Sequence, residues 1–277
     1  MNTVAAIQMA STPDVQANVD MACQLIIQAS QQGARCVALP EEFATLGIES
    51  KLKTKFAEQY NDGPIQRRFS AIAKENRIWI VGGTLPILNS SSTKAFSSCL
   101  IWNDKGECVG RYDKIHLFDV DLKENESYRE SDGVEAGDHL TVIPTPFGKL
   151  GIGICYDVRF PELFRALTFK GAEILILPSA FTFQTGQKHW KTLLKARAIE
   201  NLCYVVAPAQ VGKRLNGHGT YGHSMIIDPW GEILAIMEKD TGIIQANIDL
   251  GKLTELRKQF PALDHRRAFV IKELFEL

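Results

Sequence analysis

A short segment that joins the end of a helical pattern to a strand occurs twice in this chain of 277 residues. Residues 33–40 read Gly-Ala-Arg-Cys-Val-Ala-Leu-Pro, and residues 171–178 read Gly-Ala-Glu-Ile-Leu-Ile-Leu-Pro. In both copies glycine favours the end of a helix, and proline ends a short apolar strand. Two interpretations remain open. Glycine and leucine recur at such places by convergence, or the chain contains two related halves that make a sandwich.

Short apolar runs alternate with helical patterns along the whole chain. Strands are predicted at residues 4–9, 36–39, 78–81, 98–102, 150–154, 174–177, 204–207, 224–227, 233–236 and 243–248, and helices at 18–32, 65–76, 160–170 and 188–201. Interleaved strands and helices are typical of packed layers of sheet and helix, the α/β class. Because no linker separates the halves, we expect one domain over residues 1–277, with a C-terminal tail from about residue 250.

Charge and cysteine content narrow the class of protein. The chain has 31 basic and 32 acidic residues, which gives no electrostatic reason to expect a nucleic acid or an anionic membrane as partner. No run of 18 apolar residues is present, and the N-terminus has no basic region of the signal-peptide type. The six cysteines form no Cys-x-x-Cys pair, so we expect reduced thiols and a cytoplasmic protein.

Cys155 is the strongest candidate for a reactive residue. An apolar strand ends at this cysteine, a polar turn follows, and a helix is predicted to begin near Pro161. At a strand-to-helix turn a thiol is exposed at the end of the sheet, and nearby backbone N–H groups favour the thiolate. Most cysteines are instead small core residues, and we interpret the other five in this way.

Two further charged residues occupy places where a catalytic role is possible. Glu41 directly follows a buried strand, and burial would raise its pKa towards neutrality, as a general base requires. Lys114 lies in a segment where charged and apolar residues interleave, so its side chain is able to project into a cleft and stabilise an oxyanion. Solvated surface positions are the commoner explanation for each residue taken alone.

Other hydrolase and cofactor patterns find less support. A cysteine–histidine hydrolase would use His189 or His223, but no papain-like signature surrounds Cys155. The chain lacks the Gly-x-Ser-x-Gly pattern of serine hydrolases, and Gly151-Ile152-Gly153 has no third glycine of a dinucleotide site. The six histidines show no metal-ligand spacing. We therefore predict no metal and no organic cofactor.

Taken together and in order, these motifs resemble the nitrilase superfamily. The matching segments are Leu-Pro-Glu at 39–41, Lys-Ile-His-Leu-Phe-Asp at 114–119, Cys-Tyr-Asp-Val-Arg-Phe-Pro-Glu-Leu at 155–163, Gly-His-Ser-Met at 222–225 and Asp-Pro-Trp-Gly at 228–231. The resemblance extends from Ala6 to about Arg267. It implies a four-layer α-β-β-α sandwich of two pseudo-symmetric halves, and a homodimer in which the sandwich continues across the interface.

The resemblance also implies a Glu–Lys–Cys triad. By position, Glu41 is the general base, Lys114 the electrophilic stabiliser and Cys155 the nucleophile that forms a thioester. Many members carry a second glutamate between the lysine and the cysteine. Glu130 is the best match and is expected to orient Lys114 or the substrate, with Glu124 and Glu126 as competitors. The backbone N–H of Tyr156 is expected to help Lys114 hold the oxyanion.

The substrate implied by the resemblance is a small amide. The motifs look most like the branch that hydrolyses deaminated glutathione, in which the glutamyl amino group has become a ketone. In such relatives an arginine, a phenylalanine and a threonine contact the α-keto acid end, which here correspond to Arg159, Phe181 and Thr185. Arg159 has an alternative role in an ion pair with Asp157 or Glu162. Phe181 and Thr185 have alternative roles in packing and as a loop hydroxyl.

Several other functions remain open. Alternatives within the hydrolases are an ω-amidase acting on α-ketoglutaramate or α-ketosuccinamate, and an N-carbamoyl amino acid amidohydrolase. The alternative outside enzymes is a catalytically idle assembly subunit. The presence of Glu41, Lys114 and Cys155 together argues against this last alternative.

Overall fold

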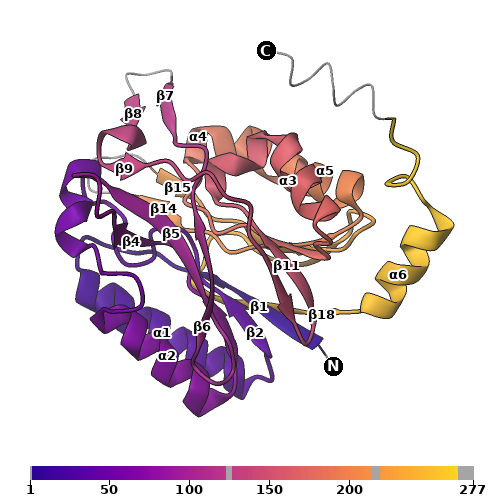
Figure 1. The fold of residues 1–277 in the computed structure, drawn as a ribbon, viewed down its shortest axis with the longest axis horizontal. Coiled ribbons are helices and arrows are strands. Elements are labelled where there is room, and N and C mark those ends of the chain that lie inside the picture. Colours follow the sequence, from indigo (N-terminus) through magenta and orange to yellow (C-terminus); the bar gives the residue numbers. More distant parts are fainter. Residues whose placement is uncertain (1, 123–126, 214–218, 268–277) are drawn as a thin grey trace.

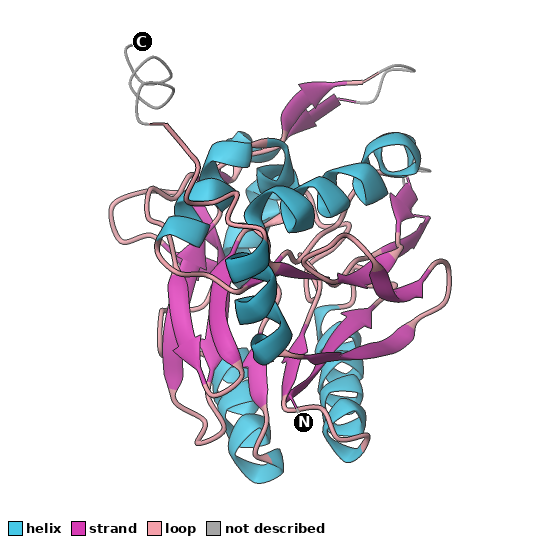
Figure 2. Cartoon of the chain, turned by 90° about the vertical axis from the view of Figure 1, so that its right-hand side faces the viewer, coloured by secondary structure: helices cyan, strands magenta, loops and turns pink. Residues whose placement is uncertain are grey.

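The fold consists of four layers, with two β-sheets face to face and helices on the outer side of each (Figure 1). The computed structural model describes residues 2–122, 127–213 and 219–267. Figure 2 shows the strands in the middle of the molecule and most of the helices on its outer sides. This arrangement confirms the α-β-β-α sandwich expected from the sequence.

The first sheet contains strands from the N-terminal half of the chain and one late strand. Its members are β1 (Asn2–Gln8), β2 (Cys36–Ala38), β3 (Trp79–Val81), β4 (Leu85–Leu88), β5 (Ala95–Trp102), β6 (Cys108–Asp113), β9 (Val134–Glu135) and β18 (Gly242–Ile248). They follow the order β18-β1-β2-β3-β5-β4, with β6 and β9 also paired to β5. Helices α1 (Val15–Gln31) and α2 (Pro64–Asn76) cover the outer face. The 3-10 helix η1 (Ser50–Phe56) lies near β4.

The second sheet and its helices come from the C-terminal half. Its strands are β10 (Val142–Thr145), β11 (Gly148–Ile152), β12 (Ile174–Ile176), β13 (Tyr204–Ala207), β16 (Ser224–Ile227) and β17 (Ile233–Met237), and they pair in this order. Helices α3 (Pro161–Phe169) and α5 (Lys191–Asn201) pack on its outer face. Two small hairpins, β7 (Asp119–Asp121) with β8 (Ser127–Arg129) and β14 (Val211–Lys213) with β15 (Gly219–Tyr221), lie outside the large sheets.

Strand alternation divides the core into two parts. Along β1, Val4 and Ala6 point to the space between the sheets, while Ala5 and Ile7 point to α1 and α2. Successive side chains on a strand point to opposite faces, so a strand buried on both sides is apolar at every position. This explains why the central strands appear in the sequence as continuous apolar runs rather than as alternating ones.

The repeated segment occupies corresponding places in the two sheets. Gly33 follows α1 with a φ of 91°, and Gly171 follows α3 with a φ of 93°. Glycine adopts this left-handed conformation without steric cost, so it ends both helices. The strands that follow, β2 and β12, are each flanked by two parallel neighbours. The two copies therefore belong to two related halves, and convergence is not needed to explain them.

Some elements differ from the sequence expectations. The helix predicted at 188–201 begins as α5 at Lys191, after a wider turn over Gly186–Trp190. Residues 250–259, assigned to a C-terminal tail, form helix α6 (Leu250–Gln259), and the side chain of Leu253 is buried. Several short strands, such as β9 and β10, were not predicted because runs of two to four residues carry little periodicity. Within the described ranges, no helix is long and apolar enough to cross a bilayer.

Candidate active site

Glu41 lies just beyond the end of β2 and is almost completely buried. Its Oε1 accepts a hydrogen bond from Lys114 Nζ over 2.7 Å, and its Oε2 accepts one from the amide of Ala180 over 2.8 Å. Burial raises the pKa of Glu41 above its usual value of 4.5, while the Lys114 ammonium opposes that rise. This agrees with the sequence expectation that burial moves the pKa of this carboxyl group upwards.

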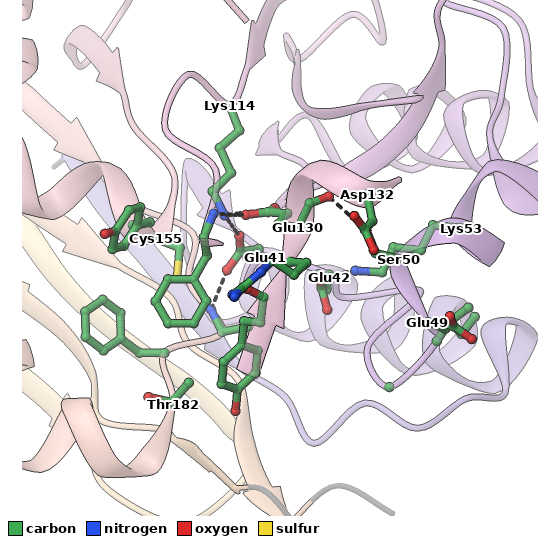
Figure 3. A pocket seen from close by; sticks show the side chains of 18 of the residues that line it. Glu41, Glu42, Glu49, Ser50, Lys53, Lys114, Glu130, Asp132, Cys155 and Thr182 are labelled. Carbon is green, nitrogen blue, oxygen red and sulfur yellow. Dashed lines mark hydrogen bonds and ion pairs between the residues drawn. The ribbon is translucent and has the colours of Figure 1, made fainter. Parts of the chain in front are cut away.

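Lys114 directly follows β6, and its side chain is only 2% exposed. Besides the contact with Glu41, its Nζ lies 3.0 and 2.7 Å from the two carboxylate oxygens of Glu130. Burial would lower the pKa of Lys114, but the Glu130 and Glu41 carboxylates outweigh burial and raise the pKa well above 10.5. Lys114 is therefore a permanent cation held between two carboxylates (Figure 3).

Cys155 is the first residue of η3 (Cys155–Arg159), a short 3-10 helix that follows β11. Its φ is 47°, a left-handed conformation that is costly for any residue with a side chain. The amide of Cys155 donates a hydrogen bond to the carbonyl oxygen of Pro178 over 2.9 Å, which fixes the turn against the end of β12. Such strained positions are typical of sites that hold a reactive group in place.

The protonation state of Cys155 differs from the sequence expectation. Burial and the nearby Glu41 carboxylate raise the pKa of the Cys155 thiol well above its usual value of 9.0, and Lys114 lowers it less strongly. The resting group is thus the thiol, although the sequence suggested that backbone N–H groups would favour the thiolate. The reason is that Cys155 is buried and faces a carboxylate, two effects that the local sequence does not reveal.

Glu130 begins the short segment η2 (Glu130–Asp132), directly after β8. Its Oε2 also accepts a hydrogen bond from the amide of Phe118 over 2.7 Å, so its carboxylate is held from two sides. The structure thus brings Glu130 to Lys114, as the sequence led us to expect. The competing residues Glu124 and Glu126 lie outside the described residues.

These side chains lie at the wall of a cavity of about 520 Å³. The residues that line it are Glu41, Glu42, Gly47, Ile48, Glu49, Ser50, Lys51, Lys53, Lys114, Phe118, Ser127, Tyr128, Arg129, Glu130, Asp132, Cys155, Tyr156, Ala180, Phe181, Thr182 and Thr185. Cavities of roughly 300–1,000 Å³ suit ligands of small-molecule size. Seven of the eight predicted site residues therefore share one cavity.

Arg159 is the exception, because it is not among the residues that line the cavity. Its guanidinium group lies 5.2 Å from the ring centre of Phe181 and 5.7 Å from that of Tyr156. Its Nη1 is 3.2 Å from Nδ1 of His189. Burial, together with the charge of Arg159, lowers the pKa of His189, so the neutral imidazole accepts this hydrogen bond. Among the described residues, no carboxylate forms an ion pair with Arg159, so the alternative role in such a pair with Asp157 or Glu162 is not seen.

Phe181 and Thr185 take the places expected of cavity-lining residues. The ring of Phe181 packs against Trp190, with ring centres 4.8 Å apart. The hydroxyl group of Thr185 lies 2.7 Å from that of Thr182. Both residues therefore have packing or loop contacts as well as access to the cavity, which agrees with both of the roles considered for them.

Asp157 is a structural anchor that the sequence did not single out. It is completely buried, and its Oδ2 accepts hydrogen bonds from the amide of Ile154 and the hydroxyl group of Tyr112, both over 2.7 Å. Its Oδ1 accepts one from the amide of His116 over 3.1 Å and lies 2.6 Å from His116 Nδ1. Asp157 thus ties the nucleophile turn to the segment that carries Lys114.

The site includes further groups that the sequence did not reveal. The amide of Ala180 is one, because it reaches Glu41 across a separation of 139 residues. Glu42 and Lys53 are others, since they form an ion pair at the cavity wall. A cluster of three or more histidine, cysteine or acidic side chains able to hold a metal does not occur in residues 2–122, 127–213 and 219–267.

Comparison with known proteins gives consistent matches over nearly the whole chain. The family model described as carbon-nitrogen hydrolase matches residues 3–258. A deaminated glutathione amidase of Yersinia enterocolitica is 41% identical over 95% of this chain and 92% of its own length. An omega-amidase NIT2 of Xenopus tropicalis is 37% identical over 94% of this chain and 93% of its own length.

A solved structure matches as well. Nit3 of Saccharomyces cerevisiae, a member of branch 10 of the nitrilase superfamily, has a TM-score of 0.84 and is 33% identical over 94% of each chain. The resemblance to that superfamily, first noted in the motifs around Glu41, Lys114 and Cys155, is confirmed at the level of the whole fold.

Proposed function

Because the chain belongs to the carbon-nitrogen hydrolase family, we propose that it is an amidase that cleaves an α-keto acid amide through a thioester on Cys155. The observation that carries this proposal is that Glu41, Lys114 and Cys155 are all buried and line one cavity, with Glu41 Oε1 2.7 Å from Lys114 Nζ. A base next to a nucleophile, with a fixed cation beside them, is the arrangement needed for acyl transfer.

In the first step Glu41 takes the thiol proton and the sulfur of Cys155 attacks the amide carbon. The carbonyl oxygen becomes an oxyanion, which Lys114 Nζ and the backbone N–H of Tyr156 stabilise. Tyr156 is the second residue of η3, a position at which the backbone N–H has no acceptor within the helix. This amide is therefore available to a developing negative charge.

In the second step the carbon–nitrogen bond breaks, and protonated Glu41 gives its proton to the leaving amine. Water then loses a proton to Glu41 and attacks the thioester, which releases the acid and restores the thiol of Cys155. The net reaction is amide plus water to carboxylic acid plus amine. No step requires a group other than these side chains and water.

Glu130 has a distinct electrostatic role in this scheme. When Glu41 receives the proton of Cys155, it no longer carries a negative charge beside Lys114. The Glu130 carboxylate, 2.7 Å from Lys114 Nζ, then keeps the ammonium group charged and in place. Glu130 therefore holds the electrophile in position during the chemical steps.

We propose deaminated glutathione or a similar α-keto acid amide as substrate, supported by the name of the Yersinia enterocolitica relative. The omega-amidase relative supports α-ketoglutaramate as the second candidate. In both compounds the acyl group ends in an α-keto acid, and we place it beside Tyr156, Phe181 and Thr185. Arg159 contacts the rings of Phe181 and Tyr156, and its guanidinium group has N–H donors beyond the one that faces His189, so it remains a candidate contact for the carboxylate of the α-keto acid.

The test is amine release from deaminated glutathione and α-ketoglutaramate by the native enzyme and by Cys155→Ala. The native enzyme should turn over at least one compound, and Cys155→Ala should retain less than about 1% of that activity. A short incubation followed by mass spectrometry should show the acyl group on Cys155. Turnover by Cys155→Ala would overturn the mechanism, and absence of turnover by the native enzyme would favour an idle assembly subunit.

We also propose that two copies pair through an apolar patch formed by Ile199, Trp230 and Phe260. These side chains are 47%, 56% and 49% exposed. The rings of Trp230 and Phe260 are in edge contact, with centres 5.6 Å apart, and the turn at Gly231 packs on Ile199. Contiguous exposed apolar side chains are typical of association sites.

The cytoplasm is the compartment that we propose for the protein, since the six free thiols fit a reducing environment.

A further inference from the structure

The cavity has two sides of different chemistry. On the side of the second sheet lie Cys155 and the neutral residues Tyr156, Phe181, Thr182 and Thr185. The opposite side is built from loops and short elements of the first half, including η1, β8 and η2, and its charged residues are Glu42, Glu49, Lys51, Lys53, Arg129 and Asp132. Figure 3 shows Glu41 between Cys155 on one side and Glu42 and Lys53 on the other.

The chemistry of the reaction determines how a substrate must lie in this cavity. The acyl carbon must lie at the sulfur of Cys155, and the leaving nitrogen must lie within reach of the Glu41 carboxyl group that protonates it. The acyl group extends along the neutral side, as proposed above. The leaving amine therefore extends past Glu41, towards Glu42 and Lys53. If the leaving group were only ammonia, the charged side would take no part in binding.

The cations of the charged side are not equivalent. The guanidinium group of Arg129 is engaged by both carboxylate oxygens of Asp121 at 2.8 Å and by two backbone carbonyl groups. Lys51 lies near the mouth, 63% exposed and 3.3 Å from Asp132. Lys53 is the deep cation, because its side chain is only 12% exposed and pairs with Glu42.

Lys53 has the hydrogen-bonding capacity to hold a ligand as well as Glu42. An ammonium group has three N–H donors, so one contact with Glu42 leaves others for a second acceptor. Because this side chain is largely shielded from water, its attraction for a carboxylate is screened less than that of an exposed lysine. Glu42 fixes the position of Lys53 before a ligand arrives.

We propose that this charged side is a leaving-group subsite that binds an amine carrying a carboxylate, such as an amino acid or a dipeptide, with Lys53 contacting that carboxylate. The inference rests on the proposed amidase function and adds the residue that recognises the departing half of the substrate. Hydrolysis then adds water across the carbon–nitrogen bond, leaves the keto acid as the acyl product and releases the amino acid or dipeptide as a free amine.

The test uses two substrates that share the acyl group and differ only in the terminal charge of the leaving group. They are the γ-amides of α-ketoglutarate with alanylglycine and with alanylglycine amide. For the native enzyme we expect kcat/KM to be roughly tenfold higher for the carboxylate, about the factor that one charged hydrogen bond supplies. α-Ketoglutaramate, which releases ammonia, serves as the reference without a subsite ligand.

The decisive comparison is the ratio of the two kcat/KM values in Lys53→Met. We expect this ratio to fall to about 1, while the kcat/KM for α-ketoglutaramate changes less. Lys105→Met is the matched control, because Lys105 lies in the exposed turn between β5 and β6 and its loss changes net charge equally. This control should leave the ratio at its native value.

The possible outcomes separate this inference from the proposed function. Native turnover of all three amides without preference for the carboxylate would overturn the subsite and leave the amidase intact. The same conclusion would follow if Lys53→Met kept the native ratio or if Lys105→Met abolished it. Absence of native turnover on every amide would instead overturn the amidase function and this inference together.

Discussion

The amide of Ala180 donates a hydrogen bond to Oε2 of Glu41 over 2.8 Å. Glu41 directly follows Pro40 of the first repeated segment, and Ala180 comes two residues after Pro178 of the second. The ends of two corresponding strands, β2 and β12, therefore meet at the carboxylate proposed as the base. The pairing of the two halves creates the site, because neither half alone contains both Glu41 and the donors that hold it.

This contact makes Glu41→Gln a precise test of the base. Glutamine retains the shape of the side chain and an oxygen that accepts from Ala180 or Lys114, but it cannot take a proton from Cys155. We expect kcat/KM to fall by roughly 10³-fold, within the range attributed to general bases. Steady-state kinetics of amine release measure the loss. A reduction of less than about tenfold would contradict the assignment.

The acid limb of the pH profile should report the pKa of Glu41. Burial raises this pKa above 4.5, and the base acts only as the carboxylate. As the pH falls through the raised pKa, Glu41 becomes protonated and kcat/KM declines. Cys155 remains a thiol and Lys114 a cation through neutral pH, because both pKa values are raised well above their usual values. An acid limb at or below about 4.5 would contradict this assignment, provided that circular dichroism shows the protein folded there.

The sequence predicted the parts of the site that depend on strand ends. Glu41 follows a buried apolar strand, and Cys155 follows another, so both were expected at the edge of a sheet where α/β folds place their sites. Packed layers and two related halves were likewise suggested by the interleaved elements and the repeated segment, whereas the four-layer sandwich was implied by the resemblance to the nitrilase superfamily. These features are local, and a single chain displays them directly.

Beyond the contacts that the resemblance implied, such as Glu130 with Lys114, the sequence did not predict contacts between distant segments. Lys53 of η1 and Ala180 of a loop enter the site along paths that depend on the packing of the whole domain. The contacts of Arg159 with Phe181, Tyr156 and His189 could not be read from its spacing from Cys155 either. The state of the Cys155 thiol depends on burial and on Glu41, which come from tertiary structure.

Removal of the apolar patch should separate the proposed dimer. We expect Ile199→Glu to yield a monomer, because a carboxylate at this position would have to lose its water in the interface. Light scattering coupled to size-exclusion chromatography measures the mass. Lys105→Glu, a charge change in an exposed turn outside the patch, is the control and should leave the mass unchanged. A native protein that is already monomeric, or an Ile199→Glu protein that remains a dimer, would contradict this interface.

Substitution of Asp157 by asparagine should affect both stability and the reactivity of Cys155. The buried carboxylate of Asp157 accepts three hydrogen bonds. The donors are the amide of Ile154, the hydroxyl group of Tyr112 and the amide of His116. Asparagine replaces one carboxylate oxygen with an NH₂ group. That NH₂ group would face a backbone N–H donor of the surrounding residues, and neither could accept a hydrogen bond from the other. We expect a loss of roughly 3 kcal/mol in the free energy of unfolding, measured by urea denaturation.

The effect of Asp157→Asn on the site can be separated from the effect on stability. Asp157 connects the turn that carries Cys155 to the segment that carries Lys114. Its loss should therefore make the positions of the Cys155 thiol and the Lys114 ammonium group less fixed, and should lower kcat more than it raises KM. Tyr112→Phe removes a single bond to Asp157 and is the graded control, with an expected loss of about 1–2 kcal/mol and a smaller fall in kcat. If Asp157→Asn were destabilised but retained the native kcat under conditions where it is folded, Asp157 would be a structural residue alone. A fall in kcat for Asp157→Asn, with a smaller fall for Tyr112→Phe, would show that the buried carboxylate aligns the nucleophile with the cation that stabilises its oxyanion.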